Sequence, residues 1–410
     1  MLTTLLALSL PAHANGQTTH VWITRHAIEH LDDGPLKELV QDPGNEAALV
    51  HGAMFPDGGY PLGHPYAEDA HWEGFQGDYQ AWIEANHAPP FSDEGARHVA
   101  FLLGLGSHGM ADQTFDAFYF NWSSIKDAEH GWAAGESFDE ASDFIMASIH
   151  GGQELPERWV PEQTLVDLYT ARGIEVDAET LGDGQALLET AVALVGFGSQ
   201  NPDLVDEYAA MFPWGGAHLD DPDLPGTPAC EGVWIAAYWQ EVYARLTDTE
   251  RPRPLLGTWP EDGAFGHERD HTQPEARVSL IFPVGLESGS PNPTNFHVED
   301  ADGGALPFEV WVYYGAGSHV VHLVPTEDWP EDADITVGAR AGLPYQNGES
   351  LDQDVSFGFS TRPRPEAPGP AVDTGGGTKP AGCATASVPL GRVGMGLGLL
   401  GLFSLGRRRR

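Results

Sequence analysis

The sequence predicts a multidomain protein in which an all-α domain is followed by an all-β sandwich. Its 410 residues are enough for two or three domains, each with a core of its own. Apolar residues recur at helical spacing up to about residue 250, whereas from about residue 270 they alternate with polar ones between Gly, Pro and Asp-Gly turns. We therefore expect a helical domain over residues 15–262 and a β-sandwich over residues 270–362.

The helical domain is organised around a buried helix within residues 94–119. Its apolar residues are spaced as on one face of a helix, and His108 and Asp112 follow on that face, four residues apart. Asp116 comes one turn later. An imidazole and two carboxylates in line on a buried face are typical of a metal site, although a His108–Asp112 hydrogen bond within the core would also satisfy them.

Composition limits both the ligands and the partners of such a site. The chain has 20 basic and 61 acidic residues, a net charge of −41, which argues against binding to nucleic acid. Its only cysteines are Cys230 and Cys383, so neither a disulfide framework nor a cysteine zinc site can be built. A metal would have to be held by imidazole and carboxylate groups.

The first residues have the character of a secretory signal peptide. Residues 1–14 contain an apolar run that ends in the small-x-small sequence Ala-His-Ala. We expect cleavage after Ala14, which makes Asn15 the mature amino terminus.

Three further candidate residues lie between the new terminus and the central helix. His20 is at the start of a helix, Asp57 is in the turn MFPDGGYPLG, and His71 is in EDAHWEGF. An Asp in a Gly- and Pro-rich turn often bonds only its own backbone, so Asp57 alone would be weak evidence.

Taken together, these motifs resemble the zinc-dependent phospholipase C/P1 nuclease superfamily. Within it the pattern is most similar to the catalytic domain of glycosylphosphatidylinositol-specific phospholipase D. The stretches that carry the resemblance span roughly residues 15–170: TTHVWITRHAIEHL, HGAMFPDGGYP, DAHWEGF, AFLLGLGSHGMAD and ERWVPEQTLVDLY.

The resemblance implies an all-α domain with a site for up to three zinc ions. The amino group and carbonyl of Asn15, with His20, would bind one ion. Asp57, His71 and His108 would bind a second ion, and Asp57 would also be the candidate general base. Asp112 would bridge the two ions, which together activate water for attack at phosphorus.

At the third zinc position the sequence departs from the superfamily. The pattern there calls for a His shortly after the bridging Asp, then a His and an acid four residues apart on the next helix. The best candidates here are Asp116, Asp139 and Asp143. A site of carboxylates alone would suit Ca²⁺ or Mg²⁺, or the residues form an ordinary solvated acidic face. His130 and His150 are spare candidates.

The β-sandwich at residues 270–362 resembles bacterial Ig-like modules. We interpret it as a spacer or adhesion unit without catalytic residues, in which His319 and His322 are ordinary strand residues.

The remaining sequence predicts attachment to the cell surface. Residues 363–382 are a Pro- and Gly-rich linker, and residues 383–410 contain an apolar run followed by Arg407–Arg410. This end resembles the C-terminal sorting signals of myxobacteria, cleaved near Cys383. Plain retention in the membrane is the alternative.

The resulting hypothesis is a secreted, surface-anchored, monomeric phosphodiesterase. Its zinc centre would hydrolyse phospholipid or glycosylphosphatidylinositol-type head groups, with phospholipase C- or D-like cleavage. One alternative is a P1-type nuclease, which shares the metal core. Another is a non-catalytic surface protein with a degraded metal site.

Overall fold

The computed structural model describes residues 15–130, 138–249, 254–315 and 317–364. Residues 15–363 belong to one compact unit. The predicted signal peptide, most of the linker and the tail at residues 383–410 lie outside the described residues and stay predictions. Within the described ranges, every helix is too short or too polar to span a bilayer.

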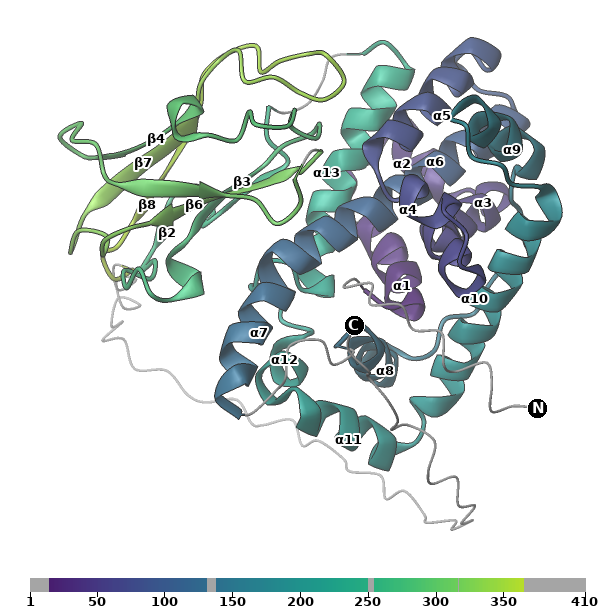
Figure 1. Cartoon of the computed structure of the whole chain (residues 1–410), viewed down its shortest axis with the longest axis horizontal. Helices are drawn as coiled ribbons and strands as arrows, with labels where there is room; N and C mark the ends of the chain where they lie inside the picture. The colour runs from purple at the N-terminus through teal and green to yellow at the C-terminus, as the bar shows by residue number, and fades with distance from the viewer. Residues whose placement is uncertain (1–14, 131–137, 250–253, 316, 365–410) are drawn as a thin grey trace, which may run out of the picture. The chain divides into compact units, whose positions relative to one another are not determined.

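The helical part runs from α1 to α13 (Figure 1). Its α-helices are α1 (Gln17–Ala27), α2 (Pro35–Gln41), α3 (Pro43–Met54), α4 (Tyr66–Ala70), α5 (Glu73–Asn86), α6 (Asp93–Thr114), α7 (Asn121–Lys126), α8 (Phe138–His150), α9 (Glu162–Ala171), α10 (Ala178–Gly198), α11 (Pro202–Met211), α12 (Pro213–His218) and α13 (Pro228–Leu246). Short 3₁₀ and π elements connect some of them: η1 (Ile28–His30), η2 (Phe55–Leu62), η3 (Phe115–Phe120) and η4 (Asp127–His130).

Helix α6 is the centre of the helical part, as the sequence predicts. Ser92 caps its first turn, because the Ser92 hydroxyl accepts a hydrogen bond from the backbone N–H of Gly95. The helix is buried on nearly every side because α1, α3, α5 and α13 all pack on it. Helix α3 approaches very closely: a Cβ on Gly104 would lie 2.2 Å from the backbone oxygen of Leu49. Only glycine permits this contact.

Directly after α6 the chain forms a π-helix, η3. The i→i+5 hydrogen bonds of a π-helix change the stagger of side chains along the axis, so residues four apart no longer stack as they do in an α-helix. Asp116 lies in this segment. The expectation that Asp116 continues the line of His108 and Asp112 rests on α-helical geometry, which ends at Thr114.

The β part consists of two four-stranded sheets, with orders β1-β3-β6-β5 and β2-β8-β7-β4. The strands are β1 (Gly257–Trp259), β2 (Ala264–Phe265), β3 (Val278–Ile281), β4 (Phe296–Asp300), β5 (Phe308–Trp311), β6 (Val320–Pro325), β7 (Asp334–Ala339) and β8 (Val355–Ser360), with short turns η5 (Pro274–Ala276) and η6 (Pro293–Asn295). Neighbouring strands are antiparallel except β2 and β8, which are parallel.

The core of the β part is formed by side chains from both sheets. Leu280 and Val321 pair across β3 and β6, and Val337 and Phe357 pair across β7 and β8. All four are buried in one apolar cluster, with Trp329 beside them. This is the two-sheet architecture that alternation predicts. Its strands begin at β1, inside the range that the sequence assigned to the helical domain, and membership of the Ig-like class stays a prediction.

Candidate metal centre

Four elements of the helical part bring five candidate ligands together. Helix α1 carries His20, η2 carries Asp57, and His71 follows the last turn of α4. His108 and Asp112 are on α6. All but Asp57 are buried, and burial of titratable groups without partners costs free energy.

The first group of converging ligand atoms contains Asp57, His71 and His108. Asp57 Oδ1 lies 3.1 Å from His71 Nε2 and 3.7 Å from His108 Nε2. Gln17 on α1 donates from its amide nitrogen to the other oxygen of Asp57. Burial alone would raise the pKa of Asp57, but the charges of His108 and His71 outweigh it and lower that pKa.

The second group contains His20, His108 and Asp112. The rings of His20 and His108 stack with their centroids 3.8 Å apart. His20 Nε2 lies 3.1 Å from Asp112 Oδ1, and His108 Nε2 lies 3.2 Å from Asp112 Oδ2.

Asp112 connects the two groups because its two oxygens face different histidines. Oδ1 faces His20, whereas Oδ2 faces His108 and also lies 3.5 Å from His71 Nε2. Burial would raise the pKa of Asp112, but the charges of His108 and His20 lower it far below its usual value. A carboxylate in this position can bridge two cations.

The histidine tautomers at the centre are fixed by backbone carbonyls. His71 Nδ1 is 2.7 Å from the oxygen of Ala67, and His108 Nδ1 is 2.7 Å from the oxygen of Ala53. A carbonyl only accepts, so each Nδ1 is the donor, and in the neutral form of each ring the Nε2 lone pair points inward. The two Nε2 atoms are 3.0 Å apart. Two lone pairs at this distance repel each other unless a proton or a metal cation lies between them.

The residues fit a transition-metal ion by this geometry and by their unsatisfied atoms. Asp112 Oδ1 and both ring nitrogens of His20 are buried and make no hydrogen bond with normal angles. Imidazole and carboxylate are the donors that suit zinc, whereas Ca²⁺ and Mg²⁺ favour oxygen alone. These residues would therefore hold zinc better than a hard cation.

Asn15, the predicted amino terminus, is 2 % exposed and is anchored by a residue that sequence analysis missed. Its amide nitrogen donates to Glu231 Oε2 at 3.2 Å, and the hydroxyl of Thr114 donates to Glu231 Oε1 at 2.7 Å. Burial strongly raises the pKa of Glu231. Glu231 does not stand out in the sequence, because it lies in the first turn of α13, where the helix dipole favours any acidic residue.

The three residues predicted for a third ion are not brought together in the same way. Among the described residues, none of Asp116, Asp139 and Asp143 belongs to a converging group of three or more ligand atoms. Asp116 is buried and lies near enough to Asp139 for that charge to raise its pKa, although burial is the larger cause. Asp143 bonds the first turn of α1.

The spare histidines do not join the centre. His150, at the end of α8, lies 2.7 Å from Asp220 through its Nε2 and stacks on Trp22. The side chain of His130 lies outside the part of the chain that can be described.

The β part contacts residues next to the centre, so it packs on the helical part. Its interpretation as a spacer or adhesion unit without catalytic residues stays a prediction. The hydroxyl of Tyr314, between β5 and β6, donates to Asp116. The backbone N–H of His319 donates to Gln113, next to Asp112, at 2.9 Å. His322 is a strand residue, as expected, but its ring also packs against Phe118 of η3.

Half-buried aromatic rings lie beside His71. The centroid of Tyr60 is 5.3 Å from that of His71, and the ring of Trp72 is 6.3 Å away. Tyr314 meets Trp72 edge to face at 4.9 Å. Together these rings form a partly exposed aromatic rim at the centre.

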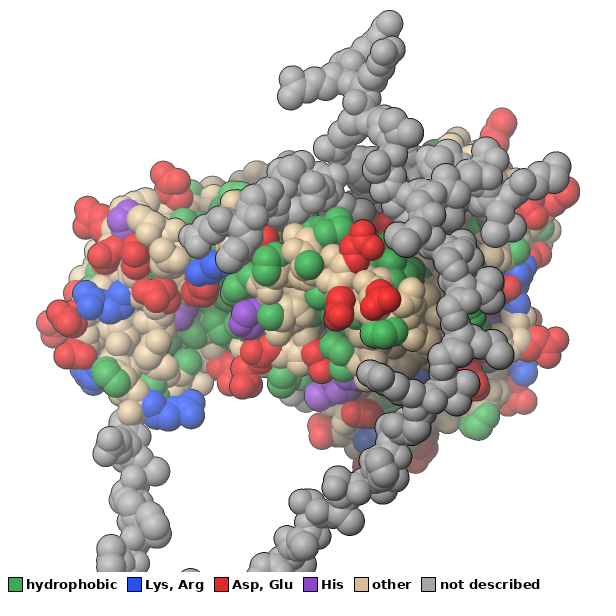
Figure 2. Space-filling view, turned by 90° about the horizontal axis from the view of Figure 1, so that it is seen from below, with side chains coloured by type: hydrophobic (Ala, Val, Ile, Leu, Met, Phe, Trp, Pro, Cys, Tyr) green, Lys and Arg blue, Asp and Glu red, His purple; other side chains and the backbone are tan. Residues whose placement is uncertain are grey.

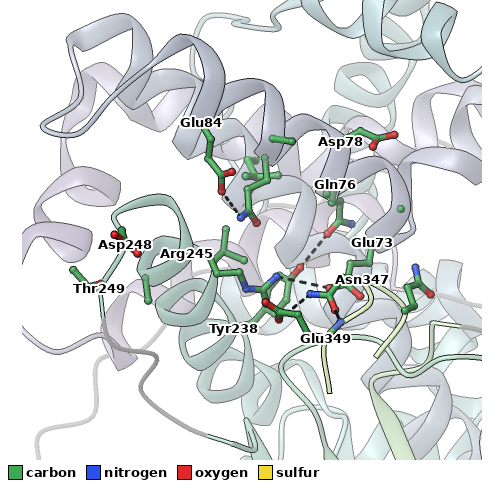
Figure 3. A pocket seen from close by; sticks show the side chains of 18 residues that line it. Glu73, Gln76, Asp78, Glu84, Tyr238, Arg245, Asp248, Thr249, Asn347 and Glu349 are labelled. Atoms are coloured by element: carbon green, nitrogen blue, oxygen red, sulfur yellow. Dashed lines mark hydrogen bonds and ion pairs between the residues drawn. The ribbon is translucent and has the colours of Figure 1, made fainter. Parts of the chain in front are cut away.

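A separate cavity of about 710 Å³ lies between α5, α13 and the segment that includes Asn347 (Figure 3). Its lining is polar and acidic, and Arg245 reaches toward Glu73 there at 3.9 Å. None of the predicted metal ligands lines this cavity. On the face shown in Figure 2, Asp and Glu side chains are spread widely, as the net charge requires.

The comparisons with known proteins agree with a lipid-hydrolase class. No protein-family profile matches the chain. A phosphatidylinositol-glycan-specific phospholipase D of Dictyostelium discoideum is 29% identical over 252 residues, which is 55% of this chain and 25% of that protein. The enzyme of that name from Bos taurus is 33% identical over 120 residues, 27% of this chain and 13% of that protein. The chain therefore spans a quarter or less of the length of these relatives, and it contains a region similar to part of these phospholipases.

Solved structures add little to this assignment. Clostridium perfringens alpha-toxin covers 84% of the chain, and the chain covers 99% of the toxin, at 10% identity and a TM-score of 0.24. The surface layer protein SbsC (domains 1–6) also covers 84% of the chain, which covers 45% of it, at 11% identity and a TM-score of 0.22. Scores this low carry no argument.

Proposed function

We propose that this chain is a zinc-dependent phosphodiesterase that hydrolyses phospholipid or glycosylphosphatidylinositol-type head groups. The observation that carries the proposal is the position of Asp112, whose oxygens face His20 on one side and His71 and His108 on the other. Two cations held on the two sides of Asp112 would suit in-line displacement at phosphorus. The relatives named phospholipase D support the substrate class.

The chain's own residues then hold and orient the reacting groups. Bound zinc would supply an acidified water and would stabilise charge on the phosphoryl oxygens. Asp57 is the proposed general base, because Oδ1 faces the imidazoles while Gln17 holds the other oxygen. The half-buried rings of Tyr60, Trp72 and Tyr314 offer an amphipathic surface for a lipid head group.

We also propose that Asn15 becomes a ligand through its free amino group and carbonyl after cleavage behind Ala14. Support comes from the burial of Asn15 and from its side-chain bond to Glu231. Secretion, and anchoring at the cell surface or release through residues 383–410, are proposed from sequence alone, as is a monomeric state.

A hydrolysis assay on metal-loaded protein with an Asn15 start tests the function. We expect turnover of phosphatidylcholine or a glycosylphosphatidylinositol lipid, and none with His108→Ala. Identification of the products separates phospholipase C from phospholipase D cleavage.

The same assay distinguishes the alternatives. Hydrolysis of single-stranded DNA but not of lipid would favour the P1-type nuclease, against which the net charge of −41 argues. Protein that holds no zinc and turns over none of these substrates would favour the non-catalytic surface protein with a degraded metal site.

A further inference from the structure

We call Asp116, Asp139 and Asp143 the carboxylate side of the centre, and the five converging ligands described above the imidazole side. The two sides differ because Asp116 and Asp143 already accept hydrogen bonds from other side chains or the backbone. The resemblance implies a third zinc at Asp116, Asp139 and Asp143, yet no converging group among the described residues contains any of them. The hydrogen bonds that these carboxylates make therefore decide whether a third ion can bind there.

Asp143 accepts hydrogen bonds from the first turn of α1. Its Oδ1 accepts from the backbone N–H of Thr19 at 2.7 Å and from the Thr19 hydroxyl at 2.8 Å, and its Oδ2 accepts from the N–H of Thr18 at 3.2 Å. The first N–H groups of a helix have no partner within it, so this carboxylate caps α1. The chain also lies directly against it, since a Cβ on Gly16 would be 2.4 Å from Asp143 Cγ.

Asp116 is held by the β part. Its Oδ2 accepts from the hydroxyl of Tyr314, and Trp72 fixes the Tyr314 ring by an edge-to-face contact. Asp116 Oδ1 makes no hydrogen bond within the described ranges. Among the described residues, Asp116 belongs to no group of three converging ligand atoms. One remaining oxygen is by itself a poor zinc site, because zinc sites in proteins use three or four ligands, mostly nitrogen and sulfur.

We infer that the centre holds two zinc ions and that Tyr314 of the β part takes the place of the third by binding Asp116. This inference rests on the proposed zinc-dependent function. A neutral hydroxyl donor stabilises a buried carboxyl group without the charge of an ion. Tyr314 is therefore a positioning residue, and the β part is needed to complete the centre.

Elemental analysis of the full chain with its Asn15 start, after dialysis against zinc-free buffer, tests the number of ions. We expect two zinc ions per chain, and still two in Asp116→Asn, whose amide oxygen can accept from Tyr314. Asp112→Asn should lose zinc. Three zinc ions in the wild type that fall to two in Asp116→Asn would overturn the inference. No zinc in the wild type would instead contradict the proposed function.

Kinetics test the positioning role of Tyr314. Tyr314→Phe keeps the ring against Trp72 but removes the donor. We expect kcat to fall about tenfold, the size of effect that the loss of one hydrogen bond can have, with KM and zinc content unchanged. Tyr313→Phe is the matched control and should leave all three values unchanged. If Tyr314→Phe leaves kcat unchanged, or acts only by lowering thermal stability, Tyr314 does not position the centre.

Discussion

The imidazole side and the carboxylate side of the centre are built from neighbouring helices but differ in their partners. His20 and Asp112 lie 3.1 Å apart, fully buried, with ring nitrogens and an oxygen that make no normal hydrogen bond. Asp143, by contrast, bonds α1 through both oxygens, and Asp116 accepts from Tyr314. Buried ligand atoms without partners on the imidazole side are available to a cation, whereas the two bonded oxygens of Asp143 have a structural role. Asp116 keeps one oxygen, Oδ1, without a hydrogen bond among the described residues.

The largest effect should come from His108, which belongs to both converging groups. His108→Ala should remove zinc from both positions and reduce hydrolysis to background. It should also lower the melting temperature, since a ligand at about a thousand times its Kd contributes about 4 kcal/mol to stability. Zinc content, turnover and calorimetry measure this. Asp300→Asn in β4 is the control, and full activity in His108→Ala would contradict the assignment.

A residue retained ahead of Asn15 should have the next largest effect. If the amino group of Asn15 is a ligand, an extra Met or tag blocks it and should reduce zinc content and turnover together. Trimming to a native Asn15 start should restore both. Equal zinc content and turnover in tagged and trimmed protein would show that the amino group of Asn15 is not a ligand.

A smaller effect should come from Glu231, which joins Asn15 to Thr114. Burial raises the pKa of this carboxyl in the folded state, so its contribution is full below its unfolded value of 4.5 and is lost as the pH rises above it. Glu231→Gln stays neutral and should make the stability of zinc-free protein less sensitive to rising pH. Denaturant unfolding from pH 4 to pH 8 measures this, and an unchanged pH slope would contradict it.

The smallest effect should come from Asp143, where one cap is weakened. In Asp143→Asn the amide oxygen can still accept from Thr19, but the bond to Thr18 is lost, which should cost about 1 kcal/mol of unfolding free energy. Zinc content should not change. Loss of a zinc ion from this variant would show that the carboxylate side binds metal after all.

The sequence alone determines the helical and β parts and the side chains on the imidazole side. Helical periodicity places α6 at the centre, and the four-residue spacing places His108 and Asp112 on one face of it. These features follow from local geometry, which repeats along the chain. Whether Asn15, His20 and the other residues do bind zinc stays a prediction.

Tertiary structure decides the rest because it depends on which distant segments meet. The π-helix at Phe115 alters the stagger beyond Asp112, and Glu231 reaches Asn15 across 216 positions. Tyr314 reaches Asp116 across 198 positions. No spacing rule applies over such separations. An acidic residue on a helix has the same sequence pattern whether it faces water, caps a neighbouring helix or binds a metal ion, and only its packing partners distinguish these roles.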